Sequence, residues 1–246
     1  MVDELFRKLL LIARPAAGKS EIINYWQNLP QEQRANRFHV GKMVEIDDFP
    51  MLWAWFEEDH ILEEMGYPRL HTDAEGYFKE DYLWDVLIRR MNLAYQKAVR
   101  ENPGLHEEAT VILEFARGVE HGGFQRAFEH LSQQVLDRLA VLYIDVSWEE
   151  SLRKNQARYN PKRPGSILEH SLPEEKMRRL YRESDWDDIE KKQGRILIQG
   201  QPIPFAVFDN QDDFTSQGGA ILGQALETTT DLLWRRYQNE YSAGGS

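Results

Sequence analysis

The sequence has no cysteine among its 246 residues, and this absence excludes several kinds of chemistry. Disulfide bonds, zinc sites with thiolate ligands and thiol nucleophiles all require cysteine. The chain also lacks any apolar stretch of the roughly 20 residues that span a bilayer. Together these absences fit a reducing compartment, so we predict a cytoplasmic protein that contacts no membrane.

Basic side chains are the scarcer charged type, because 30 lysines and arginines stand against 41 aspartates and glutamates and give a formal charge of −11. Such a charge opposes nonspecific binding to nucleic acid or anionic lipid. We therefore expect no nucleic-acid partner, and a polyanionic ligand would need a local basic patch.

The length suits a single large α/β domain over residues 1–246, with ample material for a core.

The most informative stretch joins an aliphatic run at residues 9–13 to a turn and then to a helical pattern. Its spacing fits the Walker A pattern, except that Ala13 stands where the pattern has its first glycine. We interpret it as a buried strand that delivers a loop whose backbone N–H groups hold a polyphosphate in front of a helix. Lys19 would reach the β- and γ-phosphates, and the Ser20 hydroxyl would bind Mg²⁺. We expect the nucleotide to contact Arg14, Ala16, Ala17, Gly18, Lys19, Ser20 and Glu21.

The alternative for this stretch is an ordinary strand-to-helix turn with an exposed lysine. That alternative explains Gly18 but leaves Lys19 and Ser20 as a coincidence. A strand before the loop and a helix after it are the context that the motif requires, and they favour the phosphate-binding interpretation.

Acidic residues follow two further predicted strands. Asp47 and Asp48 come after the alternating stretch 38–46, and Glu114 ends an apolar run from 109 with Arg117 close behind. Ligands of open α/β sheets bind beyond the carboxyl ends of strands, so either aspartate can accept the proton of an attacking hydroxyl or hold a Mg²⁺-bound water. Glu114 can hold Mg²⁺ through water, and the Arg117 guanidinium can donate paired hydrogen bonds to a substrate phosphate or hydroxyl. The alternatives are a turn-forming aspartate pair and an ion pair between Glu114 and Arg117.

An aromatic and acidic stretch at residues 51–101 predicts a helical insertion beside the site, with helices near 51–65 and 79–101. Its rings either stack on a flat acceptor or, as is commoner for such residues, pack in a core or a partner surface. They are Trp53, Trp55, Phe56, Tyr67, Tyr77, Phe78, Tyr82 and Trp84.

A strongly basic region lies within residues 148–192, which we interpret as a lid-like helical segment. Arg153 and Arg158 are expected to stabilise a transferring phosphoryl group, with a loop at 160–166 as the mobile tip and a helix from Ser171 to about Lys192. The alternative is a solvated helix stabilised by acid–base pairs at helical spacing. The basic residues are Arg153, Lys154, Arg158, Lys162, Arg163, Lys176, Arg178, Arg179 and Arg182.

The last part of the chain predicts a hairpin of residues 195–198 and 203–208 that ends in a buried strand, followed by an amphipathic helix over 221–237. Asp209 and Asn210, at the end of that strand, would lie near the base of a bound nucleotide.

This order of strands, loops and helices resembles the P-loop nucleoside and nucleotide kinases. The resemblance implies a three-layer α/β sandwich with a five-stranded, mainly parallel sheet of order 2-3-1-4-5, a helical insertion on the substrate side and a helical lid. It also implies that an aspartate of the Asp47-Asp48-Phe49 triplet is the base. The chain departs from the family at Ala13, at Glu21, where threonine is common, and in lacking the Asp-Gly-Phe-Pro-Arg signature of the monophosphate kinases.

We therefore predict an ATP- and Mg²⁺-dependent phosphotransferase that acts on a small acceptor such as a nucleoside, a nucleotide or another hydroxyl metabolite, as a monomer or homodimer. Lys19, Asp47, Asp48, Arg117, Arg153 and Arg158 are the expected catalytic residues, and Ser20 and Glu114 the expected metal ligands. The rival hypothesis is a nucleotide-binding module without transfer activity, whose aromatic insertion binds a partner.

Overall fold

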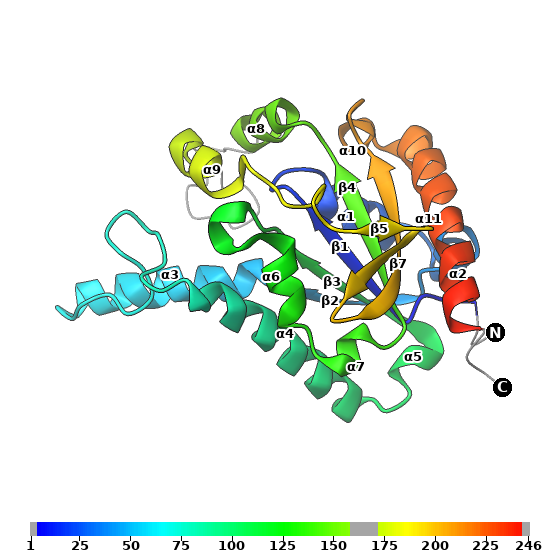
Figure 1. Ribbon diagram of the computed structural model, residues 1–246, viewed down its shortest axis with the longest axis horizontal. Helices are drawn as coiled ribbons and strands as arrows, with labels where there is room; N and C mark the ends of the chain where they lie inside the picture. Colours follow the sequence, from blue (N-terminus) through cyan, green and yellow to red (C-terminus); the bar gives the residue numbers. More distant parts are fainter. Residues whose placement is uncertain (1–3, 158–171, 243–246) are drawn as a thin grey trace.

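A mixed sheet of seven strands forms the centre of the molecule (Figure 1). The computed structural model describes residues 4–157 and 172–242. The strand order is β2-β3-β1-β4-β7-β6-β5. The strands are β1 (Lys8–Ala13), β2 (Lys42–Asp47), β3 (Ala109–Phe115), β4 (Leu139–Asp145), β5 (Lys191–Lys192), β6 (Arg195–Ile198) and β7 (Gln201–Asp209). The first five strands in the spatial order are parallel, and β6 and β5 extend the sheet antiparallel.

The sheet is larger than predicted, because the hairpin arm at 195–198 continues the sheet itself. Gln199 and Gly200 both have positive φ, of 51° and 78°, and these angles give the two-residue turn that folds β6 back along β7. The short strand β5 then pairs with β6. The predicted order 2-3-1-4-5 describes only the parallel part, β2-β3-β1-β4-β7, and omits the two antiparallel strands.

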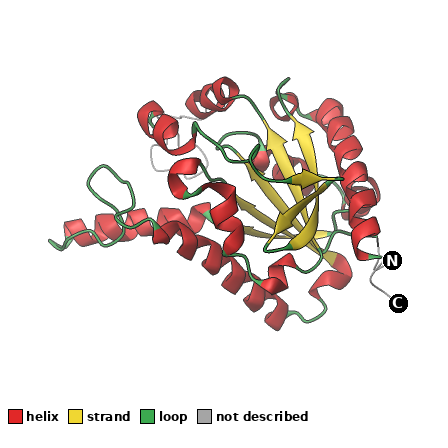
Figure 2. Cartoon of the chain, in the orientation of Figure 1, coloured by secondary structure: helices red, strands yellow, loops and turns green. Residues whose placement is uncertain are grey.

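Helices cover both faces of the sheet, as Figure 2 shows. One face packs against α1 (Lys19–Gln27), α2 (Gln31–Phe38) and α11 (Gly219–Tyr241), and the other against α4 (Tyr82–Glu101), α6 (Gly123–Glu129) and α7 (Gln133–Leu136). The remaining helices are α3 (Phe49–Glu64), α5 (Leu105–Glu108), η1 (Val119–His121), α8 (Trp148–Ala157), α9 (Glu174–Tyr181) and α10 (Phe214–Gln217). The architecture is therefore a three-layer α/β fold.

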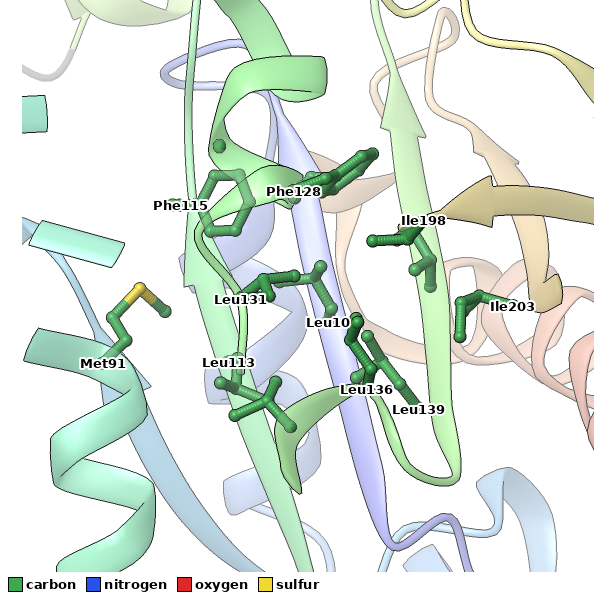
Figure 3. Packing of buried hydrophobic residues seen from close by; sticks show 14 of the residues in the cluster. Leu10, Met91, Leu113, Phe115, Phe128, Leu131, Leu136, Leu139, Ile198 and Ile203 are labelled. Atoms are coloured by element: carbon green, nitrogen blue, oxygen red, sulfur yellow. The ribbon is translucent and has the colours of Figure 1, made fainter. Parts of the chain in front are cut away.

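The alternation of side chains along β1 explains why the strand is apolar throughout. Leu10 belongs to the core cluster beneath α4, α6 and α7, whereas Leu9 and Leu11 belong to the cluster beneath α1 and α11. Figure 3 shows Leu10 beside Leu131 and Leu136 in the first cluster. A parallel strand covered on both faces needs apolar side chains on both faces, which is what the sequence has.

Helices α3 and α4 and the loop between them make up the stretch that was predicted to be a helical insertion, and α3 extends away from the sheet in Figure 1. The fully buried carboxylate of Asp59 organises the loop after α3. It accepts hydrogen bonds from the backbone N–H groups of Leu70, His71 and Thr72 and from the Thr72 hydroxyl. These bonds hold the Asp59 pKa at about 2 despite burial.

The predicted long helix before Lys192 is wrong, because α9 ends at Tyr181. The chain then turns inward, where Asp185 accepts hydrogen bonds from the backbone N–H groups of Phe124 (2.8 Å) and Gln125 (2.9 Å). These bonds cap the start of α6. Tertiary contacts therefore terminate α9. The predicted helix start at Ser171 and the loop at 160–166 lie outside the described residues.

No helix within residues 4–157 and 172–242 combines the length and apolar character needed to cross a membrane.

Candidate functional site

The β1–α1 loop (residues 14–18) lies at the carboxyl end of the central strand β1, and α1 begins directly after it at Lys19. Gly18 has φ of 115°, and a Cβ there would lie 2.6 Å from the Thr215 methyl carbon, so only glycine fits. Ala13, which replaces the first glycine of the motif, is the last residue of β1 and pairs with Ile144. It needs no unusual backbone angle, which explains why alanine is accommodated at that position.

Polar side chains that follow β4 and β7 along the chain support the β1–α1 loop. The Asn210 amide donates to the Ala17 carbonyl (2.9 Å) and to the Thr215 hydroxyl (2.8 Å). The Ser151 hydroxyl donates to the Pro15 carbonyl (2.7 Å). Asn210 is fully buried, so it acts here as a support of the loop, whereas its neighbour on β7, Asp209, is exposed.

The other loop residues take different positions. Arg14 turns towards α9, and its guanidinium donates to the carbonyls of Tyr181 and Arg182, both at 2.6 Å. A cation at the carboxyl end of a helix complements the helix dipole. Ala16 and Ala17 are buried, and the first turn of α1 carries Lys19, Ser20 and Glu21, with side chains that are half-buried, exposed and half-buried respectively.

Three carboxylates, Asp47, Asp48 and Glu114, gather where β2 and β3 end, and we call them the acidic cluster. Asp47 is paired in register with Glu114, and the Asp48 backbone N–H donates to the Glu114 carbonyl (3.4 Å). Burial, and then the charges of Glu114 and Asp48, raise the pKa of Asp47 to about 8, against the opposing effects of the Phe49 N–H and Lys19. Asp47 therefore carries a proton at neutral pH.

Asp47 also forms the turn that leads into α3, because its carboxylate accepts from the Phe49 backbone N–H (2.9 Å). Asp48, the residue before α3, makes no such capping bond. The turn-forming alternative thus applies to Asp47, while Asp48 has a different partner.

That partner is Arg117, whose guanidinium lies 2.6 Å from the Asp48 carboxylate. Asp48 is 6% exposed and Arg117 is 3% exposed, so the ion pair is buried. The Arg117 guanidinium also lies 5.0 Å from the centre of the Trp84 ring and 5.3 Å from that of Phe115. A guanidinium held between a carboxylate and two rings has little freedom to move.

An aromatic column continues from this ion pair. The His121 ring stacks on Trp84 at 3.8 Å and meets Tyr181 edge-on at 5.2 Å, and Phe78 of the insertion meets Trp84 edge-on at 4.7 Å. Burial, and then the charge of Arg117, lower the pKa of His121 to about 3, so its imidazole is neutral. These rings pack on one another, as the packing interpretation of the insertion expects.

The basic segment turns its described side chains towards protein partners. Arg153 is ion-paired with Glu150 (2.6 Å) and with Asp213 (2.8 Å), on the β4 and β7 side of the sheet. The acidic cluster lies at β2 and β3, with β1 between the two sides. The structure therefore does not bring Arg153 and the acidic cluster together, and Arg158 lies outside the described residues.

The possible metal ligands at this site suit magnesium better than a metal ion whose ligands all come from protein side chains. In the described chain, no group of three or more histidines, aspartates or glutamates has the arrangement of a metal site. Magnesium usually keeps several waters and takes only one or two protein ligands besides phosphate oxygens. Ser20 in the first turn of α1 and Glu114 in the acidic cluster supply oxygen donors of that kind, and a divalent cation would offset the crowded negative charge.

Sequence reasoning missed four residues of this region: Ser151, Thr215, Trp84 and His121. Ser151 and Thr215 come from distant parts of the chain and carry no motif. In the sequence, Trp84 is one of many aromatic residues in the stretch 51–101, and no pattern distinguishes His121 from the other histidines. Their positions depend on tertiary packing, so no local pattern indicates them.

The fold and the site define an α/β protein with a strand, glycine loop and helix at the centre of a mostly parallel sheet. No protein-family model matches the chain, and no curated protein matches it. Among solved structures it is similar to a ParA family ATPase from Chlorobium tepidum TLS, with 11% identity, a TM-score of 0.29 and coverage of 95% of this chain and 98% of that chain.

Proposed function

We propose that this protein binds Mg-ATP at the β1–α1 loop and transfers the γ-phosphoryl group to a hydroxyl of a small acceptor. The observation that carries the proposal is the position of the acidic cluster and Arg117 at the ends of β2 and β3, beside the helix that Lys19 begins. The Lys19 charge acts on the Asp47 carboxyl, so the two lie within electrostatic reach.

In this proposal the donor phosphates occupy the loop. The backbone N–H groups of residues 16–20 and the amino end of α1 stabilise their negative charge. Lys19 binds the β- and γ-phosphates. Ser20 and Glu114 would hold a magnesium ion, which would neutralise charge on the phosphates. Arg14 holds α9 through backbone carbonyls, so it acts on the site by positioning that helix.

The acceptor lies at the acidic cluster. Asp48 accepts the hydrogen bond of the attacking hydroxyl and takes its proton as the bond to phosphorus forms. Asp47 carries its own proton and donates it in a hydrogen bond that orients the acceptor. Arg117 fixes the Asp48 carboxylate in place, and positioning of this kind is a major part of catalysis in phosphoryl transfer.

The test is acceptor-dependent release of ADP from Mg-ATP by the wild type and by Lys19→Ala. We expect Lys19→Ala to lower kcat/KM by about 1,000-fold or more, because the lysine stabilises charge on the transferring group. Its thermal midpoint should remain that of the wild type, since Lys19 is only half-buried. The matched control is Lys42→Ala, at the exposed start of β2, which should keep full activity. Unchanged turnover in Lys19→Ala would refute the proposal.

A nucleotide-binding module without transfer activity is the second candidate. It is favoured by the ion pairs of the basic segment, because Arg153 is bound to Glu150 and Asp213 and not directed at the acidic cluster. Calorimetry distinguishes the two candidates: the module binds Mg-ATP in a Lys19-dependent manner but releases no ADP with any acceptor.

A further inference from the structure

The far end of α3 and the loop after it carry exposed apolar side chains. They are Ile61 (52% exposed), Met65 (63%), Tyr67 (59%) and Leu70 (64%). The loop folds back on the helix, because the Tyr67 N–H donates to the Leu62 carbonyl (2.8 Å) and the Leu70 N–H donates to Asp59 (2.6 Å). Helix α3 extends away from the sheet in Figure 1, and these side chains belong to neither core cluster. Exposed apolar side chains that gather on one part of a surface mark an interaction site, whereas single ones are ordinary.

Acidic side chains surround Ile61 on the surface of α3. Residues three and four positions away are the neighbours of a side chain on a helix. For Ile61 these neighbours are Glu57, Glu58, Glu64 and Met65. The three carboxylates are exposed, and their partners in the described chain are a tryptophan N–H and two histidines, so none is paired with a lysine or arginine there. We call this surface the acidic face of α3.

Leu93 has the opposite surroundings on α4. It is 49% exposed, and its neighbours at the same spacing are Arg89, Arg90, Gln96 and Lys97. Arg90 lies 5.6 Å from the centre of the Trp55 ring, whereas Arg89 and Lys97 are exposed and have no ion-pair partner among the described residues. We call this surface the basic face of α4. It stands out in a chain whose formal charge is −11.

We infer that the acidic face of α3 docks on the basic face of α4 of a second copy of this chain, in a twofold-symmetric homodimer. Each copy carries both faces, so the same contact forms twice. In each contact Ile61 packs beside Leu93 of the other copy, and the acidic neighbours of one face the basic neighbours of the other. Apolar residues flanked by opposite charges are the pattern by which paired helices select their partners. The inference does not depend on the proposed function.

Charge favours a second copy as the occupant of these faces. Two chains that each carry a formal charge of −11 repel one another in general, so a dimer needs a local basic surface opposite the acidic one. The basic face of α4 supplies that surface, at the same helical spacing as the carboxylates around Ile61. A different partner would have to bring such a surface itself.

The first experiment is sedimentation velocity of the full chain from about 1 µM to about 100 µM, with a dimer expected to form within this range. Ile61→Lys should weaken the dimer about tenfold or more, because it removes an apolar contact and places a cation against the basic face of α4. The matched control is Ile221→Lys on α11. Ile221 is 54% exposed, like Ile61, but its neighbours at helical spacing carry no charge, so the control should keep the wild-type dissociation constant.

A charge-reversal pair identifies which faces meet. Glu57→Lys with Glu64→Lys makes the face of α3 basic, and Arg89→Glu with Lys97→Glu makes the face of α4 acidic. Each double variant alone should be monomeric, because like charges then meet in both contacts. An equimolar mixture of the two should dimerise with about the wild-type dissociation constant, because opposite charges again meet in both contacts. All four side chains are exposed, and circular dichroism checks that each variant is folded.

Several results would overturn the inference. A wild type that stays monomeric over the whole concentration range would leave these faces to a different partner. A dimer that Ile61→Lys and Ile221→Lys weaken equally would place the contact elsewhere on the molecule. A mixture of the two charge-reversed variants that associates no better than either variant alone would show that α3 does not dock on α4.

Discussion

The two sides of the β1–α1 loop use their polar side chains differently. On the β4 and β7 side, Asn210, Thr215 and Ser151 form hydrogen bonds that hold the loop from behind. On the β2 and β3 side, Asp47 keeps a proton because it is buried and because other carboxylates lie close to it. Neither ring nitrogen of the buried His121 has a hydrogen-bond partner among the described residues. The polar groups on the first side stabilise the fold. The second side keeps a crowded carboxyl group and an unpaired imidazole ring, which lower stability, and such groups are common at functional sites.

The largest expected effect comes from breaking the buried ion pair on the β2 and β3 side. Arg117→Ala should lower the free energy of unfolding by about 3–5 kcal/mol, because it leaves the Asp48 carboxylate buried without a counter-charge. Urea denaturation followed by circular dichroism measures the change. The double variant Asp48→Asn with Arg117→Met should recover much of the loss, and a double variant no more stable than Arg117→Ala would contradict the explanation.

A smaller effect is expected on the supporting side. Asn210→Ala should lower the free energy of unfolding by about 1–3 kcal/mol, because the Ala17 carbonyl and the Thr215 N–H lose a buried partner. It should also weaken nucleotide binding, since the loop loses its support. Asn28→Ala is the matched control, because the Asn28 side chain is exposed at the end of α1. Equal stability of the two variants would show that the loop needs no support from Asn210.

The proton held by Asp47 predicts a pH dependence of stability. Its pKa is raised from 3.8 to about 8 in the folded protein, so the unfolded chain binds fewer protons across that window and stability falls as pH rises through it. Asp47→Asn removes this contribution while its side-chain oxygen still accepts from Phe49. Urea denaturation at pH 5 and pH 8 should therefore show a smaller loss of stability in the variant than in the wild type. Parallel losses in both proteins would contradict the assignment of the proton to Asp47.

The smallest effect is expected at the surface of the basic segment. Arg153→Ala should leave the thermal midpoint nearly unchanged, because its ion pairs with Glu150 and Asp213 are solvent-exposed on the arginine side. Its effect on ADP release distinguishes the two interpretations of this residue. A large loss of kcat would support a role in transfer, while wild-type kcat would leave Arg153 as a surface ion pair.

Part of the site was predictable because its signals are local. The aliphatic run before Ala13, the glycine at position 18 and the helix from Lys19 follow from neighbouring residues, and each lies where the pattern predicted. The same holds for Asp47 and Glu114, because they end an alternating and an apolar strand pattern, and the two parallel strands meet at their carboxyl ends. The chemical roles of these residues remain predictions, to be tested by the variants above.

Other features were not predictable, because they depend on which segments meet. The sequence suggested Glu114 as an ion-pair partner of Arg117, and the structure pairs Arg117 with Asp48, which follows the neighbouring strand β2. Asn210 was predicted near a nucleotide base, and it lies buried beneath the loop. The residues adjacent in sequence to Arg117 and Asn210 do not determine these contacts.

The sequence by itself determined the α/β class, the strand–loop–helix unit and the acidic residues at strand ends, because each depends on local periodicity or on a short motif. Only the tertiary structure decided that the sheet has seven strands, that α9 stops at Tyr181 and that Arg117 is neutralised by Asp48. The physical reason is that burial and charge pairing depend on residues brought together from distant parts of the chain.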